Sequence, residues 1–353
     1  GRPRCTPPLR IPVPPAEGGR PLHTCPESTP PAGSRMTARP AFAALPLIEG
    51  TGERHAWGVW GPGDDLGMLN LLTPERVRRA AGLVRRGRVF NVEPSRAVPH
   101  PNRPGETPYQ HHTHVHRGGR SDTADAFELH GGVGHLDSLR HIRYREFGYF
   151  GGRQEADLDA TPVLGIQRWA EHGVVGRGVL LDVAGHLARR GASLAPDRRF
   201  AITGELLDAV AAAQGVVFEE GDIMLLRTGW MDWYLGMAPA QRAPLAGTVH
   251  NREGGLECPG LDAAQGTAAW LWDRGFSVLL ADNIALEAMR VEGTEFQHRR
   301  ILAMLGMGIG ELFTFAELAE DCAGDGVYEF MVTVKPLSIP GGVGSPANAY
   351  VIK

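Results

Sequence analysis

Short, continuous apolar runs bounded by glycine or aspartate constrain the fold of this chain more than any other feature. The runs are Gly178-VLLDVAG, Asp222-IMLLRTGW and Phe276-SVLLAD. Such runs are typical of strands buried on both faces, and residues 205–213 and 262–274 have the pattern of helices. Because buried strands alternate with helices, the sequence predicts a mixed α/β domain with central strands packed under helices.

Capping residues mark the starts of further helices. Thr73-Pro74-Glu75 combines an N-cap threonine, a proline at the first helical position and an acidic residue, and Gly87 is expected to end this helix. Thr294-EFQ and Thr314-FAE match the capping box, which predicts two more helix starts.

The N-terminal part of the chain differs from the rest in composition. Residues 1–35 repeat proline and arginine and lack the apolar segment of a signal peptide, so they cannot build a core. We therefore expect a disordered, Pro-rich extension over residues 1–40 and one folded domain over residues 41–353. Met36 is a candidate natural start.

Charge and cysteine content exclude several classes of function. The formal net charge of -4 gives no positive field for nucleic acid, and about 18 consecutive apolar residues, enough for a membrane span, occur nowhere. None of the four cysteines forms a Cys-x-x-Cys pair, which favours a reducing compartment. The sequence predicts a cytoplasmic protein that binds neither nucleic acid nor membranes.

The segment His130-GGVG-His135-L-Asp137-SLR-His141 contains the residues best suited to chemistry. On a strand, side chains two positions apart point the same way, so His135 and Asp137 would present an imidazole and a carboxylate to one metal ion. A turn after Asp137 would bring His141 near the same point as a proton shuttle. With 14 histidines in the chain, a chance cluster is the alternative.

From Trp57 almost to its end, the chain resembles the putative cyclase family, which includes bacterial kynurenine formamidase and isatin hydrolase. The family hallmark H-x-G-T-H-x-D-x-x-x-H is matched here by V-G-H-L-D-S-L-R-H. Further similar stretches, in the expected order, are Trp60-GPGDDLGMLNLL, Cys258-PGL, Trp270-LWDRGF, His298-RRILAMLGMGIGEL and Pro336-LSIPGGVGSPANA.

The resemblance implies a fold and a set of site residues. The implied fold is a swivelling three-layer β/β/α arrangement with mixed sheets, in a homodimer or homotetramer. The implied catalytic acid/base is His141, and Trp60 matches a position that contacts substrate. The implied metal ligands are His135, Asp137, His298 and Glu311.

The first half of the motif departs from the family pattern. Gly131 occupies the position of the first histidine, and His130 lies one residue earlier. A one-residue shift turns a side chain to the opposite face of a strand, unless a bulge at Gly131-Gly132 brings it back. Whether His130 is a ligand therefore stays open, and a single ion is easier to defend than two. The alternating His112, His114 and His116 are expected in a loop near the site mouth.

Histidine and carboxylate ligands with an open position suit Zn²⁺ or Mn²⁺, which lower the pKa of a bound water towards roughly 7. The predicted activity is hydrolysis, through the resulting hydroxide, of an amide, lactam, lactone or ester in a small cyclic or aromatic carbonyl compound. Cyclisation or dehydration of a polyketide-like intermediate by the same ion is the alternative. A third interpretation takes the motif departures as loss of the site, which leaves a binding protein.

Overall fold

The computed structural model describes residues 39–98, 109–115, 121–127, 132–245, 248, 255–290 and 296–353. The chain divides into two units, Gly1–Arg39 and Pro40–Lys353. The expected disorder of residues 1–40 lies almost wholly outside the described residues and stays a prediction.

Among the described residues, nine strands form one mixed sheet in the order β1-β13-β11-β5-β7-β9-β10-β4-β12. The four strands β5, β7, β9 and β10 are parallel, and the strands on either side of them pair antiparallel. The bounds are β1 Val89–Asn91, β4 His135–Asp137, β5 Val174–Asp182, β7 Ile223–Arg227, β9 Val278–Ala281, β10 Gly308–Glu311, β11 Glu329–Val334, β12 Gly344–Pro346 and β13 Ala349–Ile352. The predicted mixed α/β class is confirmed.

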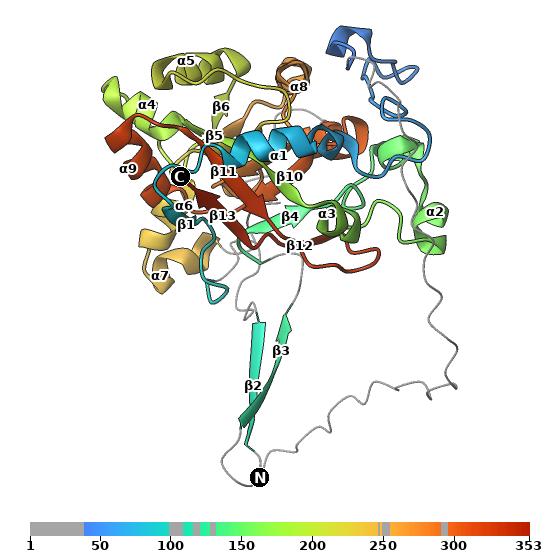
Figure 1. Cartoon of the computed structure of the whole chain (residues 1–353). Coiled ribbons are helices and arrows are strands. Elements are labelled where there is room, and N and C mark those ends of the chain that lie inside the picture. The colour runs from blue at the N-terminus through green and yellow to red at the C-terminus, as the bar shows by residue number, and fades with distance from the viewer. Residues whose placement is uncertain are drawn as a thin grey trace. The chain divides into compact units, whose positions relative to one another are not determined.

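Helices connect and cover these strands, and α1 packs on β5 and β11 (Figure 1). The α-helices are α1 Pro74–Ala81, α2 Glu155–Ala160, α3 Gln167–His172, α4 Val183–Arg189, α5 Gly204–Gln214, α6 Trp230–Gly236, α7 Pro239–Arg242, α8 Gln265–Arg274 and α9 Ala316–Asp325. Short 3₁₀ turns are η1 Phe42–Ala44, η2 Gly67–Leu71, η3 Arg145–Phe147, η4 Phe150–Gly152 and η5 Ala243–Leu245, and η6 Arg299–Met304 is a π-helix. Two small sheets pair β2 Tyr109–Val115 with β3 Ser121–Phe127, and β6 Phe200–Ile202 with β8 Pro259–Leu261.

The three apolar runs form β5, β7 and β9, whose residues are almost all buried in the main hydrophobic core. The helices predicted over residues 205–213 and 262–274 are α5 and α8. Both predictions are confirmed, because a run of apolar side chains is stable only where both faces of the strand are covered.

Helix ends were predicted less well. Thr73 does cap α1, since its side chain accepts a hydrogen bond from the Arg76 N–H, but the helix ends at Ala81, well before Gly87. The predicted cap at Thr314 is wrong: α9 begins at Ala316 after Phe315, with no side-chain cap, and the Thr314 N–H donates to the Val92 carbonyl.

The loop expected around the alternating histidines is wrong for His112 and His114, which lie on β2 and pair with Ala124 and Asp122 of β3. His116 lies outside the described residues, and so does Thr294, the expected start of a helix. In the described part of the chain, no helix is both long and apolar enough to cross a membrane.

Candidate metal centre

The pairing of β4 with β10 places three polar side chains on one face of the sheet. Glu311 lies opposite His135 in this antiparallel pair, and directly opposed residues project to the same side. Asp137 is two residues from His135 on β4, so it shares that face. All three side chains are buried.

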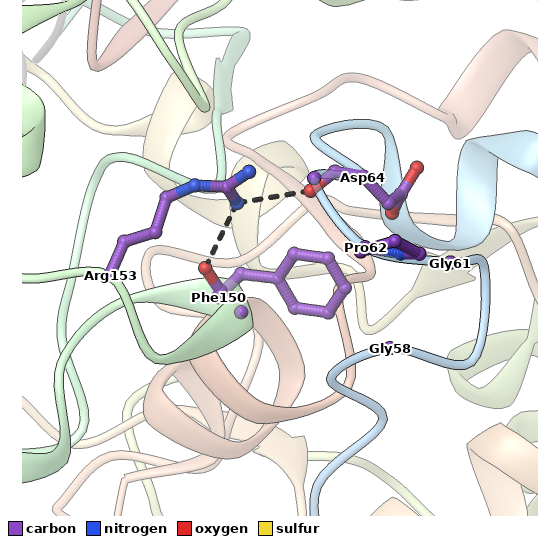
Figure 2. A pocket seen from close by; sticks show the side chains of 8 residues that line it. Gly58, Gly61, Pro62, Asp64, Phe150 and Arg153 are labelled. Atoms are coloured by element: carbon purple, nitrogen blue, oxygen red, sulfur yellow. Dashed lines mark hydrogen bonds between the residues drawn. The ribbon is translucent and has the colours of Figure 1, made fainter.

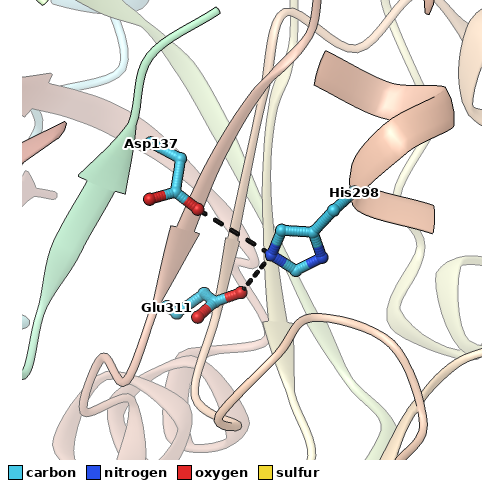
Figure 3. A group of neighbouring side chains, drawn as sticks. All are labelled: Asp137, His298 and Glu311. Atoms are coloured by element: carbon cyan, nitrogen blue, oxygen red, sulfur yellow. Dashed lines mark ion pairs between the residues drawn. The ribbon is translucent and has the colours of Figure 1, made fainter. Parts of the chain in front are cut away.

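His298 approaches the same point from the segment that leads into η6 (Figure 3). Its Nε2 atom lies 2.8 Å from Oε1 of Glu311 and 3.8 Å from Oδ2 of Asp137. One ligand atom from each of these three residues lies within 4.8 Å of the other two. Asp137, His298 and Glu311 therefore form a buried group that could hold a metal ion; we call it the Asp–His–Glu cluster.

The chemistry of the cluster fits a divalent cation. Nδ1 of His298 donates to Oε2 of Glu287 at 2.8 Å, which leaves Nε2 facing the two carboxylates. Nε2 of His298 lies 2.8 Å from Oε1 of the buried Glu311, so without a cation this contact needs a proton on Nε2. Buried carboxylates cost free energy unless positive charge compensates them, and a cation bound between them would supply that charge.

The pKa shifts of Glu311 and His298 also indicate a site that favours positive charge. Burial raises the pKa of Glu311 to about 7, and the neighbouring Asp137 adds to this rise while His298 opposes it. Burial lowers the pKa of His298, but the charges of Glu287 and Glu311 outweigh it, so the pKa of this imidazole lies well above its usual value. Three buried carboxyl groups around one imidazole favour positive charge at this point.

His135 and His141 flank the cluster. Nε2 of His135 lies 3.7 Å from Oδ1 of Asp137 and 3.7 Å from Oε2 of Glu311. His141 lies in a turn after β4, in which its N–H donates to the Ser138 carbonyl at 3.0 Å. Its Nε2 lies 4.0 Å from Oδ2 of Asp137. The His141 side chain is 26% exposed, so it borders both the cluster and solvent.

Two of the residues predicted to serve the site are not placed there. His130 lies outside the described residues, so its role as a ligand stays a prediction. Trp60 is partly buried against the main core, and its predicted contact with substrate also stays a prediction.

A cavity of about 380 Å³ is lined in part by residues that are close to Trp60 in the sequence (Figure 2). Within it, the Arg153 guanidinium donates to the carbonyls of Asp64 and Phe150. The lining residues are Gly58, Gly61, Pro62, Gly63, Asp64, Phe150, Gly151 and Arg153. Because no residue of the Asp–His–Glu cluster is among them, this cavity is a different feature from the candidate metal centre.

Sequence reasoning missed Glu287, the partner of His298. The one signal was a single acidic residue within the apolar stretch Ile284-ALEAM. A carboxylate there is buried on folding and needs a polar partner, but the sequence does not say which one.

The fold and the cluster together define a mixed α/β protein with a buried carboxylate and imidazole group suited to a metal ion. A family model described as putative cyclase matches residues 83–288, more than half of the chain. A solved structure described as a novel cyclase is 31% identical, with a TM-score of 0.73, over 85% of this chain and 99% of that chain. The chain belongs to the putative cyclase family.

More distant solved structures share the fold. Isatin hydrolase A from Labrenzia aggregata, bound to benzyl benzoate, is 17% identical with a TM-score of 0.51, over 77% of this chain and 94% of that chain. Isatin hydrolase A from Ralstonia solanacearum is 16% identical with a TM-score of 0.53, over 75% and 92%. A comparison with curated proteins finds no matching sequence.

Proposed function

We propose that this protein is a metal-dependent hydrolase that cleaves an amide, lactam, lactone or ester bond in a small cyclic or aromatic carbonyl compound. The observation that carries the proposal is the convergence of Asp137, His298 and Glu311, with His141 beside them. The isatin hydrolases, which share the fold, are named for a cyclic carbonyl compound, and this supports the substrate class.

Asp137, His298 and Glu311, with His135 beside both carboxylates, would hold Zn²⁺ or Mn²⁺, both of which accept oxygen and imidazole ligands. Such an ion would supply an acidified water molecule and a polarised substrate carbonyl. The burial of the three ligands keeps bulk water from competing with their charges.

His141 would move the proton. Its Nε2 faces Asp137, so the imidazole can take a proton from a water molecule at the cluster and pass it to the leaving nitrogen or oxygen. Its partial exposure allows the proton to exchange with solvent between turnovers. An imidazole suits this role because its ordinary pKa lies near neutral pH.

The test combines metal analysis with isotope labelling. Purified protein would be stripped with a chelator, reloaded with Zn²⁺ or Mn²⁺, and incubated with lactams, lactones, amides and esters in ¹⁸O-water. We expect reloading to restore activity and one ¹⁸O atom to enter the product carboxylate. A protein that takes up neither ion, or turnover insensitive to stripping, would contradict the proposal.

The description of the family and of its 31% identical member as cyclases supports a second candidate function. The same cluster would then promote cyclisation or dehydration of a polyketide-like intermediate. Ring formation without ¹⁸O incorporation would favour this candidate.

A homodimer or homotetramer in the cytoplasm, without nucleic acid or membrane partners, remains our proposal. Light scattering of the purified protein would test the assembly.

A further inference from the structure

The loop that follows β9 holds a carboxylate in a fixed position. Glu287 is 0% exposed. On either side of it, the Leu286 carbonyl accepts from the Leu261 N–H and the Ala288 N–H donates to the Leu261 carbonyl, each at 2.9 Å. The Asn283 amide donates to the carbonyls of Pro259 at 2.7 Å and Leu286 at 3.2 Å. The loop therefore leaves the Glu287 backbone little freedom.

This carboxylate determines which nitrogen of His298 faces the cluster. Oε2 of Glu287 accepts from Nδ1 of His298 at 2.8 Å. A neutral imidazole that donates from Nδ1 carries its lone pair on Nε2, and only a nitrogen with a lone pair can bind a metal ion. Nε2 is the atom that points to Asp137 and Glu311 (Figure 3).

We propose that Glu287 is a positioning residue that fixes the ring orientation and tautomer of His298 and so sets the affinity of the Asp–His–Glu cluster for a divalent ion. The inference rests on the proposed function, because it assumes that the cluster binds Zn²⁺ or Mn²⁺. Such hydrogen-bond partners of metal-binding histidines are worth about 10–100-fold in metal affinity.

Two variants of nearly equal size separate orientation from packing. Glu287→Gln keeps an oxygen that can accept from His298, whereas Glu287→Met fills a similar volume and removes the acceptor. Dissociation constants for Zn²⁺ and Mn²⁺ would be measured on the full chain by competition with a chromophoric chelator. We expect the constant to rise about 10–100-fold in Glu287→Met and to stay much nearer the wild-type value in Glu287→Gln.

Asp222 provides a matched control. It is a buried carboxylate paired with Arg177 at 2.7 Å. It lies just before β7, at the N-terminal end of the parallel strands, whereas Glu311 lies at their C-terminal end. Asp222→Asn should lower the free energy of unfolding, measured with urea, and leave both dissociation constants unchanged. A loss of metal affinity in this variant as large as in Glu287→Met would show a general effect of lost stability and overturn the proposal.

Two other results would overturn it: wild-type affinity in Glu287→Met, or equal losses in Glu287→Gln and Glu287→Met. If Glu287→Met does not fold, ¹⁵N NMR of the wild-type histidines tests the inference instead. The zinc-loaded protein should show His298 protonated at Nδ1, and protonation at Nε2 would refute the inference. A wild-type chain that binds neither ion would instead refute the proposed function.

Discussion

A buried ion pair joins the N-terminal part of the domain to the helix that follows His298. Arg300 donates from Nε to Oε2 of Glu53 at 2.9 Å and from Nη2 to Oε1, and its Nη1 donates to the Ala263 carbonyl. Each side chain of the pair is only 9% exposed. If Glu53 is replaced by leucine, the guanidinium keeps one acceptor and stays buried.

The expected cost of Glu53→Leu is about 3–5 kcal/mol, the usual cost of leaving one charge of a buried pair without its partner. The double variant Glu53→Leu/Arg300→Met should recover most of this loss, because apolar residues of similar volume replace such pairs at little cost. The exposed pair between Glu75 and Arg78, with side chains 72% and 70% exposed, provides the control, and Glu75→Ala should lower the free energy of unfolding far less than Glu53→Leu does.

The effect should also depend on pH. Burial raises the pKa of Glu53, but the hydrogen bonds from Arg300 and Gln265 outweigh it, so its pKa lies below the ordinary value. A carboxylate with a lowered folded-state pKa stabilises the protein above its unfolded-state pKa, and this contribution is lost as the pH falls through the folded-state value. The deficit of Glu53→Leu should therefore be full at pH 7 and shrink in acid.

Urea denaturation of the metal-free protein, monitored by tryptophan fluorescence, measures these differences in the free energy of unfolding at pH 7 and at acidic pH. A loss of less than about 1 kcal/mol in Glu53→Leu at pH 7, or a double variant no more stable than the single one, would contradict the assigned role of this ion pair.

Two further predictions concern the cluster. His141→Ala should keep the full metal content, because His141 is outside the three-ligand group, and should lower kcat about 100–10,000-fold. Replacing the exposed His172 by alanine should change neither quantity. A wild-type kcat in His141→Ala would show that His141 takes no part in the mechanism. Asp137→Asn should lower the metal content measured by mass spectrometry, since a neutral amide is a weaker ligand than a carboxylate, and full occupancy would count against the ligand assignment.

The sequence predicts elements well where the physical cause is local or periodic. The run that becomes β7 is apolar at consecutive positions and is bounded by Asp222 and Gly229, so its burial could be inferred without any knowledge of its neighbours. The Thr73 cap acts on Arg76 within the same turn and was visible for the same reason. At Thr314 a local motif misled, because a tertiary hydrogen bond to Val92 holds this backbone instead.

The same distinction applies to the site. The two-residue spacing of His135 and Asp137 predicted a shared face, and β4 has it. That His298 and Glu311 join this face came from the family resemblance, because no local pattern connects residues so far apart in the chain. Glu287 was missed since its role depends on a contact with His298 that forms only when the loop after β9 folds back.

From the sequence a single ion was easier to defend than two, and the arrangement of the carboxylates bears on that number. Asp137 turns Oδ1 towards Nε2 of His135 at 3.7 Å and Oδ2 towards Nε2 of His298 at 3.8 Å. Glu311 does the same, with Oε2 3.7 Å from His135 and Oε1 2.8 Å from His298. Each carboxylate thus presents one oxygen to each imidazole, so these side chains offer ligand atoms near both His135 and His298.

We therefore expect two equivalents of Zn²⁺ or Mn²⁺ per chain at saturation. Nδ1 of His135 lies 2.9 Å from the Gly132 carbonyl, a contact that turns Nε2 towards the carboxylates as Glu287 does for His298. In a calorimetric titration, His135→Ala should bind one equivalent and His172→Ala two. One equivalent in the wild type, unchanged in His135→Ala, would show that His298 and the two carboxylates form a single site.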